Sequence, residues 1–169
     1  EFLSLEDEEA RKTFNLGKDV RDWKVSYAKA DLENHYPDKG SFTKLSYRPF
    51  DDRWTFYTGN SKGFHCYPRT EVMQHFTIGK NIGLVVKRQC KLDFSYAFLT
   101  TKITEGCLFE SAYANNSILP LYLYPETNGQ QTIEQDSERK PNLNQEIVNQ
   151  IADRLGLTFT NEKETTENT

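Results

Sequence analysis

Residues 47–58, YRPFDDRWTFYT, place two arginines among five aromatic residues. Strands favour aromatic side chains, but a soluble core does not need guanidinium groups between them. Arginine binds phosphate and carboxylate groups through a planar fork of donors, and it also stacks on aromatic rings. The stretch therefore has two interpretations, a strand with a decorated edge or a surface that contacts a negatively charged partner.

The distribution of charge bears on this choice. Residues 44–102 contain ten Lys and Arg against four Asp and Glu, a net charge of +6, whereas the remaining residues carry −10. A basic segment between acidic ends is typical of a chain that contacts nucleic acid, although a solvated rim around an aromatic core has the same composition. The cations that we predict to contact DNA phosphates are Arg48, Arg53, Lys62, Arg69, Lys87 and Lys91.

Arg88 and Gln89 have the residue types that read bases directly. They follow each other at the end of a strand predicted over residues 81–89. In the major groove, arginine pairs with guanine and glutamine pairs with adenine, each through two hydrogen bonds. We therefore predict that Arg88 and Gln89 read bases.

Other chemistry has weaker support in the sequence. The segment GNSKG at 59–63 lacks the spacing of a phosphate-binding loop, and we interpret it as the turn of a hairpin. His65, Cys66 and His75 have no second pair of ligands at zinc-like spacing. We predict no metal site and no complete catalytic site.

The sequence predicts a single α+β domain, a mainly antiparallel sheet with flanking helices. The polar segment 126–142 and the tail 161–169 have the composition of disordered chain, and a four-residue apolar repeat near the C-terminus predicts a helix. The expected parts are a helical lead-in over 1–40, a β-rich recognition core over 41–125, a disordered loop over 126–142, a C-terminal helix packed on the core over 143–160, and a disordered tail over 161–169.

Cysteine usage and hydropathy indicate the compartment. The three cysteines include no C-x-x-C pair, which favours a reducing compartment, the cytoplasm. No apolar run approaches the roughly 18 residues of a membrane span, so we expect no membrane partner. The chain starts without methionine, and we expect it to be part of a longer polypeptide.

Five segments in this order carry a resemblance to a known family: DVRDWKVSYAKADLE, YRPFDDRWTFYTGNSKGFHCYPRTEVMQHF, NIGLVVKRQ, LPLYLYPE and NLNQEIVNQIADRLGLTF. Over roughly residues 15–160 the chain resembles the C-terminal target recognition domain of restriction–modification polypeptides. In these polypeptides an adenine-specific DNA methyltransferase precedes this domain, often with a nuclease and sometimes with a helicase.

The resemblance implies that this segment recognises double-stranded DNA, alongside the methyltransferase domain of the same polypeptide. S-adenosylmethionine would bind upstream, so no cofactor is expected in this fragment and we expect it to be non-catalytic alone. The sequence agrees with this division, because the Asn-Pro-Pro-Tyr signature of adenine methyltransferases is absent. The alternatives are a protein-interaction or scaffold domain with an incidental basic rim, and a nuclease or hydrolase fragment.

The resemblance also bears on the two arginines of the opening stretch. The YRPFD-x-R segment recurs among enzymes expected to read different sequences, which implies that Arg48 and Arg53 serve structural pairing or contact the DNA backbone. Base reading is then expected in more variable parts, residues 59–66, 88–94 and 104–117.

Overall fold

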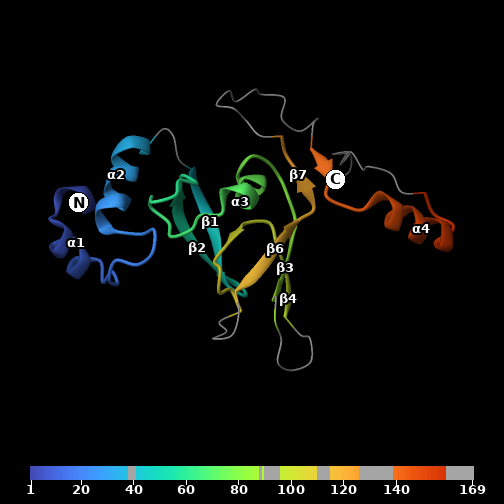
Figure 1. Cartoon of the computed structure of the whole chain (residues 1–169), viewed down its shortest axis with the longest axis horizontal. Helices are drawn as coiled ribbons and strands as arrows, with labels where there is room; N and C mark the ends of the chain where they lie inside the picture. Colours follow the sequence, from blue (N-terminus) through green and yellow to red (C-terminus); the bar gives the residue numbers. More distant parts are fainter. Residues whose placement is uncertain (38–40, 88, 90–95, 110–114, 126–138, 159–169) are drawn as a thin grey trace, which may run out of the picture.

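A computed structural model describes residues 1–37, 41–87, 89, 96–109, 115–125 and 139–158. The described residues form four α-helices and three small sheets along an elongated molecule (Figure 1). The helices are α1 (Asp7–Thr13), α2 (Val25–His35), α3 (Thr70–Thr77) and α4 (Gln145–Leu155), and a 3₁₀ turn covers Phe2–Ser4. The predicted class, a single α+β domain with mainly antiparallel pairing, is confirmed.

The first sheet has the strand order β2-β1-β5. Strands β1 (Ser41–Arg48) and β2 (Asp51–Tyr57) are antiparallel, and β5 (Ile103–Thr104) joins β1 in parallel. The hairpin turns at Pro49 and Phe50, because proline cannot donate to a strand ladder and Phe50 adopts a left-handed φ of 64°. The prediction that residues 59–63 turn a hairpin is therefore wrong; they lead from β2 into α3.

The second sheet is antiparallel throughout. It has the order β4-β3-β6, with β3 at Gly83–Lys87, β4 at Ala97–Thr100 and β6 at Asn116–Pro120. Helix α3 lies between this sheet and the first one, contacting both β5 and β6. Tyr57, Met73, Phe76 and Ile103 form the core at this junction, with Leu45 and Ile118 packed against them.

A third, two-stranded sheet pairs β7 (Tyr122–Leu123) with β8 (Lys140–Pro141). The backbone N–H of Asn142 continues this contact by donating to the carbonyl of Leu121 over 2.7 Å. The prediction of disorder over 126–142 is thus wrong for residues 139–142, because partners distant in sequence fix them. Residues 126–138 and 161–169 lie outside the described part of the chain.

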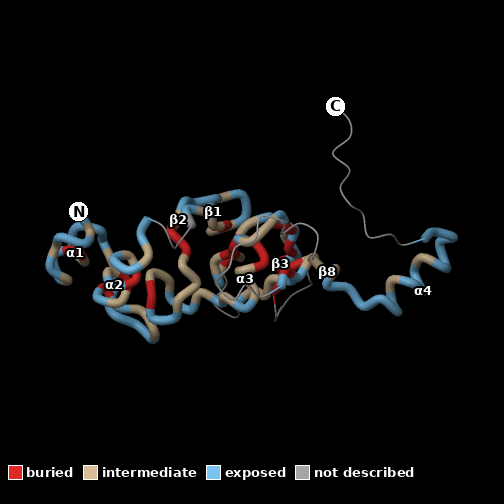
Figure 2. Tube along the Cα trace, turned by 90° about the horizontal axis from the view of Figure 1, so that it is seen from above, coloured by how far each residue is buried: buried red, intermediate tan, exposed pale blue. Residues whose placement is uncertain are grey.

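The C-terminal helix forms as the four-residue repeat predicts. Asn144 caps it by accepting a hydrogen bond from the backbone N–H of Ile147, and Gly156 ends it with a left-handed φ of 65°. The predicted packing on the core is not observed, since every residue of α4 is exposed or half-buried (Figure 2). The apolar repeat predicts the helix, but it does not predict which surface covers the apolar side of the helix.

Candidate nucleic-acid interface

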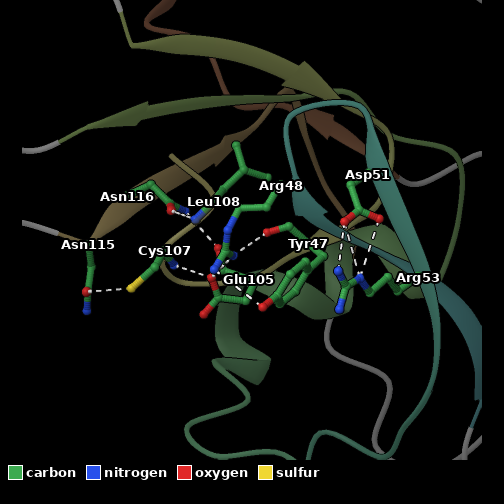
Figure 3. Close-up of polar contacts among 9 residues, drawn as sticks. All are labelled: Tyr47, Arg48, Asp51, Arg53, Glu105, Cys107, Leu108, Asn115 and Asn116. Atoms are coloured by element: carbon green, nitrogen blue, oxygen red, sulfur yellow. Dashed lines mark hydrogen bonds and ion pairs between the residues drawn. The ribbon is translucent and has the colours of Figure 1, made fainter. Parts of the chain in front are cut away.

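Tyr47 is the centre of the cluster formed by the opening stretch (Figure 3). The guanidinium carbon of Arg48 lies 4.1 Å from the centroid of the Tyr47 ring, and that of Arg53 lies 3.7 Å from it. The pairing of β1 with β2 is irregular between Ser46 and Arg48, next to the hairpin turn. Cation–π attraction and ion pairs therefore hold both arginines at this end of the sheet.

Each of the two arginines also has an acidic partner. Arg48 Nη1 lies 3.0 Å from Glu105 Oε2, and Arg53 Nη2 lies 3.0 Å from Asp51 Oδ2 (Figure 3). The hydrogen bond with Asp51 raises the pKa of Arg53. The two arginines are thus already paired with carboxylates within the domain. These pairs favour the structural role that we inferred for Arg48 and Arg53 over a contact with DNA phosphates.

Glu105 extends the cluster into the segment that follows β5. Its Oε2 atom also accepts a hydrogen bond from the backbone N–H of Cys107 over 2.7 Å, and Asn116 Oδ1 accepts one from the N–H of Leu108 (Figure 3). Arg48 thereby links the β1–β2 hairpin to residues 105–108, inside one of the stretches in which we expect base reading. The hairpin thus supports a candidate reading segment.

A second ion pair joins the hairpin to the turn before β5. Lys102 Nζ lies 2.8 Å from Asp52 Oδ2, and the hydrogen bond with Lys102 lowers the pKa of Asp52. Ser46, which is buried, bridges Asp52 and the hydroxyl of Thr100. The carboxylates at 51 and 52 thus act in pairing, each with its own cation.

Residues 58–67 are held against residues 22–35, and we call this arrangement the helix–loop clasp. Asp31, which is buried on α2, accepts hydrogen bonds from the Thr58 hydroxyl over 2.6 Å, from the Asn60 amide over 2.7 Å and from the backbone N–H of Phe64 over 2.8 Å. Burial opposes the charge of this carboxylate, but the three hydrogen bonds, with His35 nearby, keep its pKa below the usual range.

Two further contacts complete the clasp. Trp23 Nε1 donates to the carbonyl of Phe64 over 3.1 Å, and Asp22 accepts from the backbone N–H of Tyr67. Gly63 is required in this loop, since a Cβ there would lie 2.5 Å from Asp31 Oδ2. The loop is therefore fixed in shape by α2 and the turn before it.

Two of the predicted phosphate-binding cations lie here, Lys62 within the clasp and Arg69 two residues after it. Both are exposed, and both have a left-handed φ of 54°. Arg69 comes directly before α3, with its guanidinium 5.6 Å from the centroid of the Tyr67 ring. Because hydrogen bonds already order the backbone around Lys62, only its side chain has to be ordered when it contacts a phosphate, which suits Lys62 to DNA contact.

The predicted residues at the end of β3 have different surroundings. Lys87 is 9% exposed, and its ammonium lies 4.5 Å from the centroid of the Tyr96 ring. Burial against an aromatic ring suits a packing role better than the phosphate contact we predicted. Gln89 is exposed beyond the end of β3, as a base-reading residue requires. Arg88 and Lys91 lie outside the described residues.

The residues considered for metal binding or nucleophilic chemistry have local roles. His65 Nε2 is 2.8 Å from the Thr55 hydroxyl, and His75 Nδ1 accepts from the backbone N–H of Tyr124 over 3.1 Å. Burial lowers the pKa of both histidines. Burial and the neighbouring Asp22 raise the pKa of the Cys66 thiol, which disfavours the reactive thiolate. Within the described ranges, no three His, Cys, Asp or Glu residues are grouped to hold a metal ion.

An apolar groove of about 720 Å³ lies between the N-terminal helices and the β1–β2 hairpin. Its walls include Phe14, Leu32, Tyr36, Phe42 and Trp54, of which all but Leu32 are exposed. No sequence pattern predicted this groove, because its walls come from segments far apart in the chain, from Glu1 to Phe64. The alternation over residues 52–58 places Trp54 on the same face of a strand as Phe56, but it does not indicate an opening beside Trp54.

The described residues thus form an α+β domain that displays two cations, Lys62 and Arg69, on and next to a loop held in shape by α2. The model of the Type ISP C-terminal specificity domain matches residues 1–166, and the chain belongs to this family. The resemblance to a restriction–modification specificity domain is thereby confirmed, and it fits DNA target recognition in such a system. No curated protein and no solved structure matches the chain. Among the described helices, none has the length and apolar character to cross a membrane.

Proposed function

We propose that this chain recognises double-stranded DNA for an adenine-specific methyltransferase of the same polypeptide, in the cytoplasm, and that it is non-catalytic alone. The match to a specificity domain over residues 1–166 is the observation that carries this proposal. The net charge of +6 over residues 44–102 supports it. The methyltransferase domain, with S-adenosylmethionine as its cofactor, would lie outside this chain.

Lys62 and Arg69 are the cations that we propose for phosphate contact. Both are exposed; Lys62 lies within the helix–loop clasp, and Arg69 follows the clasp by two residues. Gln89, with Arg88 before it, is proposed to read bases, since it follows β3 and is exposed. Lys91 stays a predicted phosphate contact. Arg53, which is half exposed beside Asp51, could reach the DNA backbone only by exchanging its partner.

The test is the salt dependence of duplex DNA binding by this chain, measured by fluorescence anisotropy. Because phosphate contacts release counterions, affinity should fall steeply with salt, from dissociation constants of about 10⁻⁴–10⁻⁶ M. Lys62→Ala and Arg69→Ala should each weaken binding to all sequences and reduce the salt slope by roughly one unit. Lys12→Ala, an exposed cation on α1, is the matched control. Absence of duplex binding at low salt would refute the proposal.

The cofactor assignment has a separate test. Isothermal titration of this chain with S-adenosylmethionine should give no heat of binding, because the residues that would hold the cofactor are proposed to lie in the methyltransferase domain. Micromolar binding would contradict the proposed division between recognition and methyl transfer.

A protein-interaction domain is the second candidate function, and the apolar groove favours it. A groove with several exposed aromatic walls is typical of surfaces that bind another protein or another part of the same polypeptide. The mobility of random-sequence duplex in a native gel separates the two candidates, because an interaction domain with an incidental basic rim should not shift it.

A further inference from the structure

The sheet β4-β3-β6 carries a row of leucines on one face. The antiparallel register places Leu84 opposite both Leu99 and Leu119, so that the three side chains lie next to one another across the sheet. They are 39%, 66% and 51% exposed, respectively. We call these three residues the leucine row.

The other face of the same sheet is part of the core. Val85, which alternates with Leu84 along β3, is fully buried, and Ile118 packs against the cluster that contains Phe76 of α3. Among the described elements, α3 covers this face, and the leucine row lies on the opposite one. A sheet that is apolar on both faces is normally covered on both, so the leucine row lacks its layer.

Helix α4 also has an apolar side that no described part of the chain buries. Ile147, Ile151 and Leu155 repeat every four residues along one side of the helix, and all three are exposed. A helix of 11 residues is marginally stable in water, even with a good cap such as Asn144. The apolar side of α4 therefore needs a surface to pack on.

The chain attaches α4 beside the leucine row. Asn142 is fixed to the end of β6, because its side-chain amide donates to the carbonyl of Pro120 over 3.0 Å and its N–H donates to that of Leu121. Pro120 directly follows Leu119. The two residues between Asn142 and α4 can span about 7 Å.

The dimensions of the two surfaces also agree. Three strands at about 4.8 Å spacing set the leucine row across roughly 10 Å of sheet. The stretch from Ile147 to Leu155 extends about 12 Å at 1.5 Å per residue. The apolar side of α4 is thus long enough to cover all three leucines.

We propose that α4 docks on the leucine row of its own chain by rotation about residues 143–144. Docking would cover both exposed apolar surfaces at once and give the sheet a helix on each face. A two-residue tether presents α4 to this face at an effective concentration in the millimolar range, which favours the chain's own sheet over that of a second copy.

Hydrogen–deuterium exchange of the unmodified chain tests this docking. The amides of α4 should be protected by at least about tenfold relative to an unfolded peptide, because a docked helix opens less often than an isolated one. The protection should be equal at low and at high protein concentration. Unprotected α4 amides would overturn the proposal, and so would protection only at high concentration, which would assign the face to α4 of a second copy.

Charged substitutions test whether the leucine row is the surface on which α4 docks. Leu119→Lys, and separately Leu99→Lys at the most exposed position, should abolish the protection of α4 while the amides of the β1–β2 hairpin keep theirs. Val20→Lys, at an exposed apolar residue of the N-terminal part, is the matched control and should leave α4 protected. If α4 stays protected in both leucine variants, its partner is another surface and the proposal is wrong.

Discussion

Replacing Asp31 should destabilise the domain more than its position on a surface helix suggests. In Asp31→Ala, the Thr58 hydroxyl, the Asn60 amide and the N–H of Phe64 lose their common acceptor. An unsatisfied buried donor costs about 1–3 kcal/mol, and because these donors are half-buried we take the lower figure for each, a total of about 3 kcal/mol. Domains of this kind have free energies of unfolding of about 5–15 kcal/mol, so the loss is large.

The assay for Asp31→Ala is urea unfolding followed by tryptophan fluorescence, since Trp23 donates to the same loop at Phe64. The midpoint should fall at an unchanged slope. Glu33→Ala, at an exposed residue of the same helix, is the control and should change the free energy of unfolding by less than about 0.5 kcal/mol. A change for Asp31→Ala as small as that of the control would refute the role of Asp31 as the anchor of the loop.

The same carboxylate makes stability depend on pH. The pKa of Asp31 is lower in the folded chain than in the unfolded one, so its contribution is complete above the ordinary carboxyl pKa of about 4. It is lost as the pH falls from there through the depressed folded value. The difference in unfolding free energy between the unmodified chain and Asp31→Asn should therefore shrink below pH of about 4, and an unchanged difference would contradict the pKa shift.

Two further substitutions test the packing around the candidate interface. Arg48→Ala should lower the free energy of unfolding by about 1–2 kcal/mol, because it removes a half-buried ion pair and a stacked guanidinium. Arg53→Ala, at a more exposed pair, should lower it less, and equal losses in urea unfolding would contradict this difference in burial. Gly83→Ala should lower the free energy of unfolding by about 1–3 kcal/mol, since its Cβ would lie 2.6 Å from the Phe76 ring, whereas Gly106→Ala, with open space around it, should be nearly neutral in the same urea unfolding assay.

Local patterns in the sequence predicted those elements that local physics determines. The four-residue repeat near the C-terminus predicted α4, which starts after the cap Asn144 and ends at Gly156. The alternation of apolar and polar residues over 52–58 predicts a strand, which is observed as β2 (Asp51–Tyr57), whereas Pro49 belongs to the turn of the hairpin. Turn position depends on which strands pair, and periodicity within one strand does not contain that information.

The candidate site was predictable only in part for the same reason. Exposed cations at 62 and 69 were identified by charge alone, whereas the burial of Lys87 depends on contact with Tyr96, beyond the end of its own strand. Asp31 gave no signal, because its partners lie 27 to 33 residues further along the chain. Acidic residues on a helix are ordinarily solvated, and only the fold shows that this one is enclosed.

The helix–loop clasp limits how specificity could be exchanged between relatives. A chimera that takes residues 58–69 from one protein and residues 22–35 from another would separate the loop from the carboxylate, the indole and the backbone contacts that shape it. Such a graft would then transfer the amino-acid sequence of the loop but not its conformation. The smallest exchangeable unit on this side of the domain therefore begins before Asp22 and ends after Arg69, even though the DNA contacts that we propose occupy only its second half.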